Sequence, residues 1–94
     1  MRLRREGDDL VVTHLWGFRT RIPRAAIASI EPIEKTGALA GIGVHGWGGH
    51  WTVNTRRRPA VRVTLRESVR AWVLFAPVRL ETLDLAPATP ADLA

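Results

Sequence analysis

Residues 36–54 read TGALAGIGVHGWGGHWTVN, and the interpretation of the whole chain depends on this uncharged stretch. It contains six of the eight glycines in a sequence that is otherwise rich in arginine. A helix is disfavoured here, because each glycine costs about 1 kcal/mol relative to alanine. Glycine instead suits backbone that turns sharply or lies close to another segment. The stretch is therefore predicted to be a glycine-rich loop that leads into a β-hairpin with its turn at Gly48-Gly49.

The alternation of side chains along strands divides this hairpin into two faces. With the turn at Gly48-Gly49, Trp47 lies opposite His50. His45 then lies opposite Thr52, and this polar and aromatic face is expected to be solvated. The opposite face is expected to be buried and carries Val44, Trp51 and Val53.

The residues before this stretch are predicted to form antiparallel strands over 1–5, 10–16 and 18–22. The first two are separated by a turn at Glu6-Gly7-Asp8-Asp9. A two-residue turn at Trp16-Gly17 separates the next two and would bury Val11, Leu15, Phe18 and Ile22. The other face would present Val12, His14, Trp16, Arg19 and Arg21. Pro32 prevents a long helix further on, so a single turn over 24–26 and a strand over 27–34 are predicted.

The residues after the stretch are predicted to form further strands. Residues 54–59, NTRRRP, form a basic turn, and the alternation over 60–66 points Val61, Val63 and Leu65 inward. A turn at Glu67-Ser68 is followed by a strand over 69–75. A three-residue loop there buries Val69, Ala71 and Val73 and is favoured over a two-residue loop, which would bury Trp72. Pro77 interrupts the chain before a last strand over 80–86, where Leu83 and Leu85 are the buried anchors.

Composition indicates one globular domain over residues 1–94, because 46% of the residues are hydrophobic and the length supports one modest core. The net charge of +5 favours anionic partners, although frequent arginine is also typical of GC-rich genomes. The absence of cysteine excludes disulfides, thiolate zinc sites and cysteine nucleophiles.

The beginning of the chain, MRLRREGDD, lacks the apolar run of a signal peptide, so a cytoplasmic protein is expected. The uncharged stretch is nearly long enough for a membrane span. Its histidines, polar residues and glycines leave too few large apolar side chains for that role. No transmembrane segment is predicted.

About seven short strands followed by a helix start resemble a PH-like (pleckstrin-homology-like) domain. The start of the helix is the sequence TPAD at 89–92, where Thr89 suits the N-cap and Pro90 the first helical position. The segments that resemble uncharacterised bacterial PH-like proteins from GC-rich genomes are FRTRIP (18–23), IASI (27–30), GVHGWGG (43–49), RPAVRVTL (58–65) and PVRLETL (77–83).

This resemblance implies a mainly β fold, in which a bent antiparallel sheet or partly open barrel is closed at one corner by a C-terminal helix. Here that helix is expected to be truncated to a single turn. Small barrels of the SH3 or OB type are the competing folds. The resemblance implies no catalytic residue.

Two features depart from the family pattern. Phosphoinositide-binding PH domains carry basic residues around the first hairpin loop, whereas this loop is Glu6-Gly7-Asp8-Asp9. Inositol phosphate binding in that mode is therefore not expected. A shortened C-terminal helix would leave an apolar edge uncovered, which favours self-association or a partner.

No reactive group of residues is predicted. The sequence GIGVHG at 41–46 matches G-x-G-x-x-G, but no helix is expected after it, so turn geometry explains the glycines better than a dinucleotide site. His14, His45 and His50 would bind a metal only if they converged, which their spacing does not require. No Ser-His-Asp arrangement is indicated, and Asp8-Asp9 sits in a turn. A non-enzyme without metal or cofactor is predicted.

The preferred hypothesis is a non-catalytic PH-like protein-interaction or scaffold module that binds a protein partner or a second copy of itself. The alternative is binding of nucleic acid or an anionic lipid surface, with arginines on phosphates and aromatic rings on bases. The competing interpretation is that the arginines only solvate outer strand faces. The candidate ligand-binding residues are His14, Trp16, Arg19, Arg21, His45, Trp47, His50, Arg56, Arg57 and Arg58.

Overall fold

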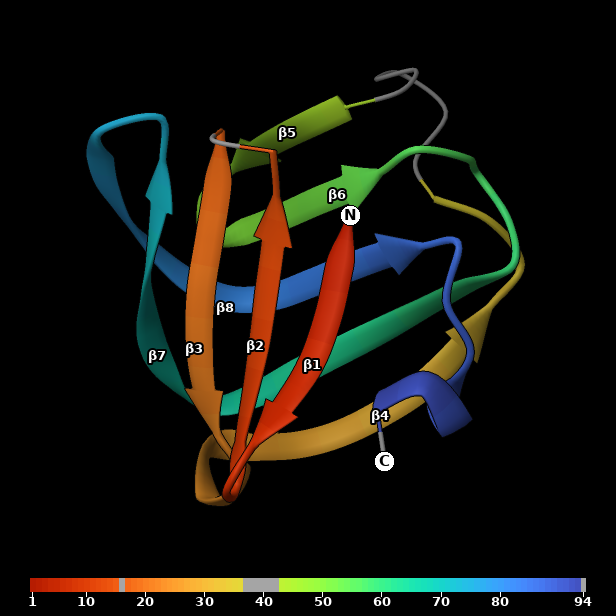
Figure 1. Cartoon of the computed structure of the whole chain (residues 1–94), viewed down its shortest axis with the longest axis horizontal. Helices are drawn as coiled ribbons and strands as arrows, with labels where there is room; N and C mark the ends of the chain where they lie inside the picture. Colours follow the sequence, from red (N-terminus) through yellow and green to blue (C-terminus); the bar gives the residue numbers. More distant parts are fainter. Residues whose placement is uncertain (16, 37–42, 94) are drawn as a thin grey trace.

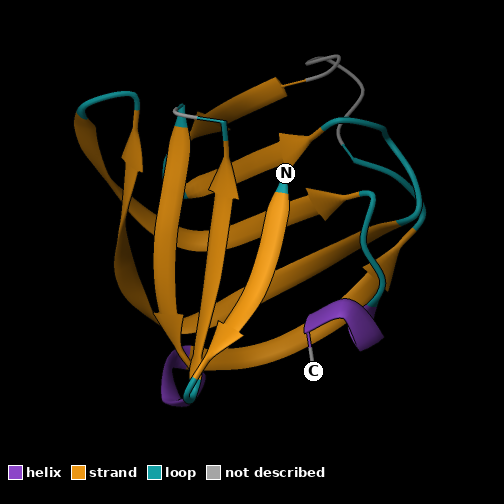
Figure 2. Cartoon of the chain, in the orientation of Figure 1, coloured by secondary structure: helices purple, strands orange, loops and turns teal. Residues whose placement is uncertain are grey.

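Eight strands within the described residues, 1–15, 17–36 and 43–93, form one sheet that does not close on itself (Figure 1). In this computed structural model the strand order is β1-β2-β3-β7-β8-β6-β5, and β4 pairs with β7 beside that path. The strands are β1 (Arg2–Glu6), β2 (Asp9–His14), β3 (Phe18–Pro23), β4 (Ile27–Ile33), β5 (Gly43–Trp47), β6 (His50–Asn54), β7 (Ala60–Val73) and β8 (Ala76–Ala86). Two 3-10 turns, η1 (Arg24–Ala26) and η2 (Pro90–Leu93), are the helical elements of these residues (Figure 2). The mainly β fold class is confirmed.

The 14-residue strand β7 takes part in both layers of the molecule. Its first half pairs with β4, its second half pairs with β3, and β8 runs antiparallel along both halves. The β7–β8 register shifts between Thr64 and Val69, which is where the long hairpin bends. The front layer consists of β1, β2, β3, the second half of β7 and the first half of β8. It crosses a back layer that consists of β5, β6, β4 and the other halves of β7 and β8 (Figure 1).

The core lies between these two layers, and the alternation of side chains along each strand determines which residues enter it. In β3, for example, Phe18 and Ile22 are buried, whereas Arg19 and Arg21 point outward and are exposed. Val44 and Trp51, which were predicted to be buried, are half-buried and pack against the core. The fully buried large apolar side chains from the other strands are Leu10, Val12, Val53, Val61, Val63, Leu80, Leu83 and Leu85.

The turn η2 covers one corner of the core beside β1 and β4. The Thr89 backbone N–H donates a hydrogen bond of 2.8 Å to the Asp92 carboxylate, which stabilises the start of the turn. Leu93 is buried, and its carbonyl accepts a hydrogen bond from the Arg5 guanidinium.

The β5–β6 hairpin has the predicted register. Trp47 pairs with His50 and His45 with Thr52. Gly48 and Gly49 have φ values of +58° and +87°, which glycine adopts without strain in a two-residue hairpin turn. The single turn at η1 and the strand β4 are also confirmed.

The predicted two-residue turn between β2 and β3 is wrong. The structure pairs His14 with Phe18, so three residues connect the strands, and Leu15 adopts a φ of +51°. This shift by one residue reverses the faces of β2. Val12 is buried rather than outward, and Leu15 is exposed rather than buried. Val11 is outward but still buried, because it lies between the arginines at positions 4 and 21.

The predicted turn at Glu67-Ser68 is also wrong, because β7 continues to Val73 and turns at Leu74-Phe75. The side chains of residues 69–73 that point toward the core were nevertheless predicted correctly. Ala71 is buried, and Val69 and Val73 pack against the core. Pro77 does not interrupt β8, because β6 pairs with β8 only from Thr82 onward and so requires no N–H from Pro77.

One strand pair departs from the expected antiparallel arrangement. β6 and β8 run parallel, with Trp51 beside Leu83 and Val53 beside Leu85. Because β7 lies between β6 and β8 in the sequence, its length carries the chain back across the molecule before β8 begins. The other strand pairs among the described residues are antiparallel.

Candidate anion-binding face

Outward side chains of the front layer form a basic surface, which we call the arginine face. Alternation turns its arginines outward because the intervening residues enter the core. The register places Arg2, Thr13, Arg19 and Trp72 in one row, and Arg4, Val11 and Arg21 in the next. Arg70 and Arg79 face each other across β7 and β8. The exposed arginines of this face are Arg2, Arg4, Arg19, Arg21, Arg70 and Arg79.

Two carboxylates of this face, those of Glu6 and Asp9, lie at one end, beside the β1–β2 turn. Arg21 donates to Glu6 at 2.9 Å and to Asp9 at 3.1 Å, and Arg4 lies 2.7 Å from Glu6. Hydrogen bonding from Arg21, followed by the charge of Arg4, lowers the pKa of Glu6. The same hydrogen bond, which Arg21 donates to Glu6, raises the pKa of Arg21. Arg4 and Arg21 are therefore largely neutralised by their neighbours.

The remaining arginines lack such partners. Within the part of the chain that the structure describes, no ion pair involves Arg2, Arg19, Arg70 or Arg79. Arg19 lies over the Trp72 ring, with its guanidinium carbon 5.9 Å from the ring centroid, which is a cation–π distance. Like charges directly opposite each other destabilise a strand pair, and Arg70 and Arg79 are arranged in this way. These side chains are free to receive an anion.

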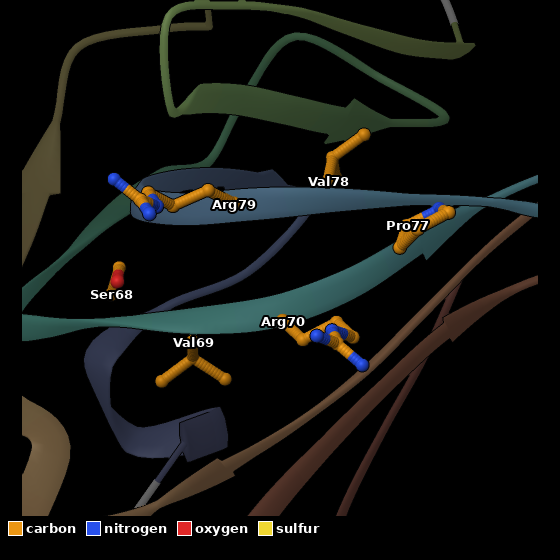
Figure 3. A pocket seen from close by; sticks show the side chains of 6 residues that line it. All are labelled: Ser68, Val69, Arg70, Pro77, Val78 and Arg79. Carbon is orange, nitrogen blue, oxygen red and sulfur yellow. The ribbon is translucent and has the colours of Figure 1, made fainter.

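These two arginines contribute to the lining of a shallow hollow of about 430 Å³ (Figure 3). Ser68, Pro77 and Val78 contribute to its lining. Figure 3 shows the two arginine side chains extending in opposite directions from neighbouring strands.

Three exposed apolar side chains adjoin the arginine face, and we call them the apolar tip. They are Leu15 in the β2–β3 turn, 83% exposed, and Leu74 and Phe75 in the β7–β8 turn, 53% and 88% exposed. The two turns are joined by a hydrogen bond of 2.8 Å from the Leu74 N–H to the Gly17 carbonyl. This tip was not predicted from the sequence, because Leu15 was expected in the core and residues 74 and 75 within a strand.

The structure brings together only some of the predicted site residues. Arg19 and Arg21 share the arginine face, as predicted. His45, Trp47 and His50 instead belong to the outer face of the back layer. Trp16 lies outside the described residues. The sequence prediction placed His14 on the outer face, which is wrong, because it lies on the inner side of β2 opposite Phe18.

The basic turn at 54–59 is separate from the arginine face. Figure 1 shows it at the right, whereas the β7–β8 turn is at the upper left. Arg57 has a structural role, because its guanidinium donates to the Thr36 carbonyl at 3.4 Å and its own carbonyl accepts from the Thr36 N–H at 2.9 Å. Arg56 and Arg58 are exposed.

The three histidines do not converge, since His14 faces the core of the front layer while the other two lie on the back layer. Among the described residues, no three histidine or carboxylate side chains are placed to hold a metal ion.

A further polar cluster on the back layer was not predicted from the sequence. Asp84, only 2% exposed, accepts hydrogen bonds from Arg62 at 2.9 and 3.1 Å and lies 2.9 Å from His50 Nε2. The hydrogen bond to Asp84 raises the pKa of Arg62. The cluster joins β6, β7 and β8, and it compensates a buried carboxylate. The signal in the sequence was an acid between the buried anchors Leu83 and Leu85.

His14 provides a test of the corrected β2 register. Its Nδ1 atom is buried without a hydrogen-bond partner among the described residues. Burial, and then the positive N-terminal amino group, lowers the pKa of His14. The unfolded chain, with a histidine pKa of about 6.5, therefore binds the proton more readily than the folded chain. Stability contributed by neutral His14 is present above about pH 6.5 and is lost as the pH falls toward the folded-state pKa.

We therefore expect the free energy of unfolding to fall less steeply on acidification in His14→Gln than in the unmodified protein. Urea denaturation at several values between about pH 5 and 8 measures this slope. Equal slopes for the two proteins would show that His14 is not buried as described.

No family model, curated protein or solved structure matches the chain. The described residues also include no helix that is long and apolar enough to cross a membrane.

Proposed function

We propose that the protein is a non-catalytic binding module whose arginine face binds a polyanion that carries phosphate groups. The observation that carries this proposal is the clustering of Arg2, Arg19, Arg70 and Arg79 on one outer face without ion-pair partners among the described residues. Arginine suits this role because its planar guanidinium donates two hydrogen bonds to one phosphate.

The polyanion proposal corresponds to the alternative hypothesis from the sequence. The preferred sequence hypothesis, a PH-like protein-interaction or scaffold module, remains a prediction, as do the cytoplasmic location and the lack of enzymatic activity. We favour a polyanion because four exposed arginines of one face have no ion-pair partner among the described residues, and such a concentration of positive charge attracts a negatively charged ligand. A protein scaffold requires no such arrangement.

The proposal predicts that Arg19→Gln/Arg70→Gln/Arg79→Gln weakens polyanion binding by about 100-fold, since each of the three arginines contributes about 1 kcal/mol near an anionic surface. The measurement is a titration of a fluorescent single-stranded oligonucleotide, and separately of vesicles containing phosphatidylserine, at about 50 and 200 mM salt. The steepness of the salt dependence for the oligonucleotide should fall in the variant.

The matched control is Arg24→Gln/Arg56→Gln/Arg58→Gln, which removes three exposed arginines outside the arginine face. This control should bind nearly as well as the unmodified protein. Equal weakening by both triple variants would show that net charge alone is responsible. Absence of binding to either probe at low salt would refute the proposed function.

A further inference from the structure

We propose, on the basis of the function proposed above, that the polyanion is an anionic lipid bilayer, into which the apolar tip inserts while the arginine face contacts the lipid headgroups. The protein would then lie on the membrane surface with the β2–β3 and β7–β8 turns pointing into it. This inference rests on the apolar tip and on the order of charges along the front layer.

The apolar tip is the first observation. Three apolar side chains, those of Leu15, Leu74 and Phe75, extend from two adjacent turns into solvent. The exposure of their apolar surface to water is unfavourable. A nucleic acid offers its phosphates to arginines but has no apolar phase to receive two leucines and a phenylalanine. A bilayer offers both, because exposed apolar side chains can enter the boundary between headgroups and acyl chains.

The second observation is the order of side chains along the front layer. At about 3.3 Å per residue, Arg19 and Trp72 lie about 7 Å or less from the turns that carry the tip, and Arg70 and Arg79 about 13 Å from them. Asp9 lies about 20 Å along the strand from Leu15 by the same measure, at the opposite end of β2. Figure 1 shows this separation, with the tip turns at the upper left and the β1–β2 turn at the bottom.

These spacings match the layers of a membrane surface. Apolar groups of interfacial proteins enter about 5–10 Å, and each headgroup layer is about 5–8 Å thick. With the tip inserted, the unpaired arginines reach the phosphates and Trp72 lies at the interface, where tryptophan is favoured. Glu6 and Asp9 stay in water, away from the anionic lipids that would repel them. The contact is therefore made by the end of the sheet opposite the Glu6-Gly7-Asp8-Asp9 loop.

The test compares the unmodified protein with Leu15→Asn/Leu74→Asn/Phe75→Ser. Asparagine is chosen because Leu15 and Leu74 have positive φ values, which asparagine tolerates. Binding to vesicles of phosphatidylserine and phosphatidylcholine should weaken by about 100-fold, given the apolar area withdrawn from the membrane. Binding to a single-stranded oligonucleotide should change less than about twofold, because the arginines remain.

Insertion of the tip into the bilayer can be measured with a fluorophore. Because the sequence has no cysteine, a single introduced cysteine can be labelled specifically. An environment-sensitive fluorophore on Phe75→Cys should shift to the blue when phosphatidylserine vesicles are added. The same fluorophore on Asp8→Cys, at the acidic end, should show no shift. Vesicles of phosphatidylcholine alone should give little response at either position.

Three outcomes would overturn the lipid assignment. Vesicle binding that the tip variant does not weaken would leave the arginine face as a polyanion site without insertion. Binding of the oligonucleotide but not of vesicles would identify nucleic acid as the ligand. A dimer in light scattering that the tip variant dissociates would show that the tip contacts a second copy. If the protein binds neither probe, the proposed function fails as well.

Discussion

Leu83→Ala is expected to lower the free energy of unfolding by about 2–5 kcal/mol. Leu83 is fully buried in β8 and has strand neighbours on both sides, Trp51 of β6 and Val63 of β7. Truncation to alanine leaves a cavity that three paired strands cannot readily fill, because each is fixed by its hydrogen bonds to the next. Urea denaturation monitored by far-UV circular dichroism measures the loss.

The matched control for Leu83→Ala is Phe75→Ala, which removes a larger side chain that is exposed at the apolar tip. Its effect on unfolding should remain within about 0.5 kcal/mol. A small effect of Leu83→Ala would contradict the arrangement of the core, including the parallel pairing of β6 with β8.

Gly46→Val is expected to lower the free energy of unfolding by about 3 kcal/mol, which is at the upper end of the range for overpacking a core. Gly46 lies directly opposite Trp51 in the β5–β6 hairpin. A Cβ atom at position 46 would overlap the Trp51 ring at Cδ2, Cε3 and Cε2, so the indole would have to leave its place against the core. Strand propensity alone predicts that Gly46→Val raises the free energy of unfolding, since valine favours strands and glycine does not.

A double-mutant cycle distinguishes these two explanations. In a Trp51→Ala background the space above position 46 is empty, so Gly46→Val should become neutral or stabilising. The coupling between the two positions should approach the full cost of Gly46→Val. An equal cost in both backgrounds would mean that the indole does not cover Gly46.

The parts of the fold that could be predicted from the sequence are those in which local chemistry determines the geometry. Gly48-Gly49 permitted one tight turn, and that turn set the register of β5 and β6. The β2–β3 turn gave no comparable signal. Leu15 adopts a positive φ there, which is uncommon for leucine and is not expected from the sequence. Glu67-Ser68 looked like a turn, yet these two residues are exposed in a continuous strand at the bend of β7.

The site was predicted less completely for the same reason. Arg19 and Arg21 were recognised because the alternation of β3 was read correctly. Arg70 and Arg79 were missed, since a turn predicted before residue 69 and a break at Pro77 concealed the hairpin that sets them opposite each other. The partnership of Asp84 with Arg62 and His50 depends on the parallel β6–β8 pair. Pairing between strands so distant in the sequence is set by the packing of the whole core.

The length of β7 has a consequence for how the molecule loses its structure. A single continuous strand supplies hydrogen-bond partners to both layers, so neither layer can detach without breaking pairs that the other needs. The chain should therefore melt cooperatively in one all-or-none transition rather than in two stages. A destabilising substitution at either end of β7 should therefore lower the stability of both layers together.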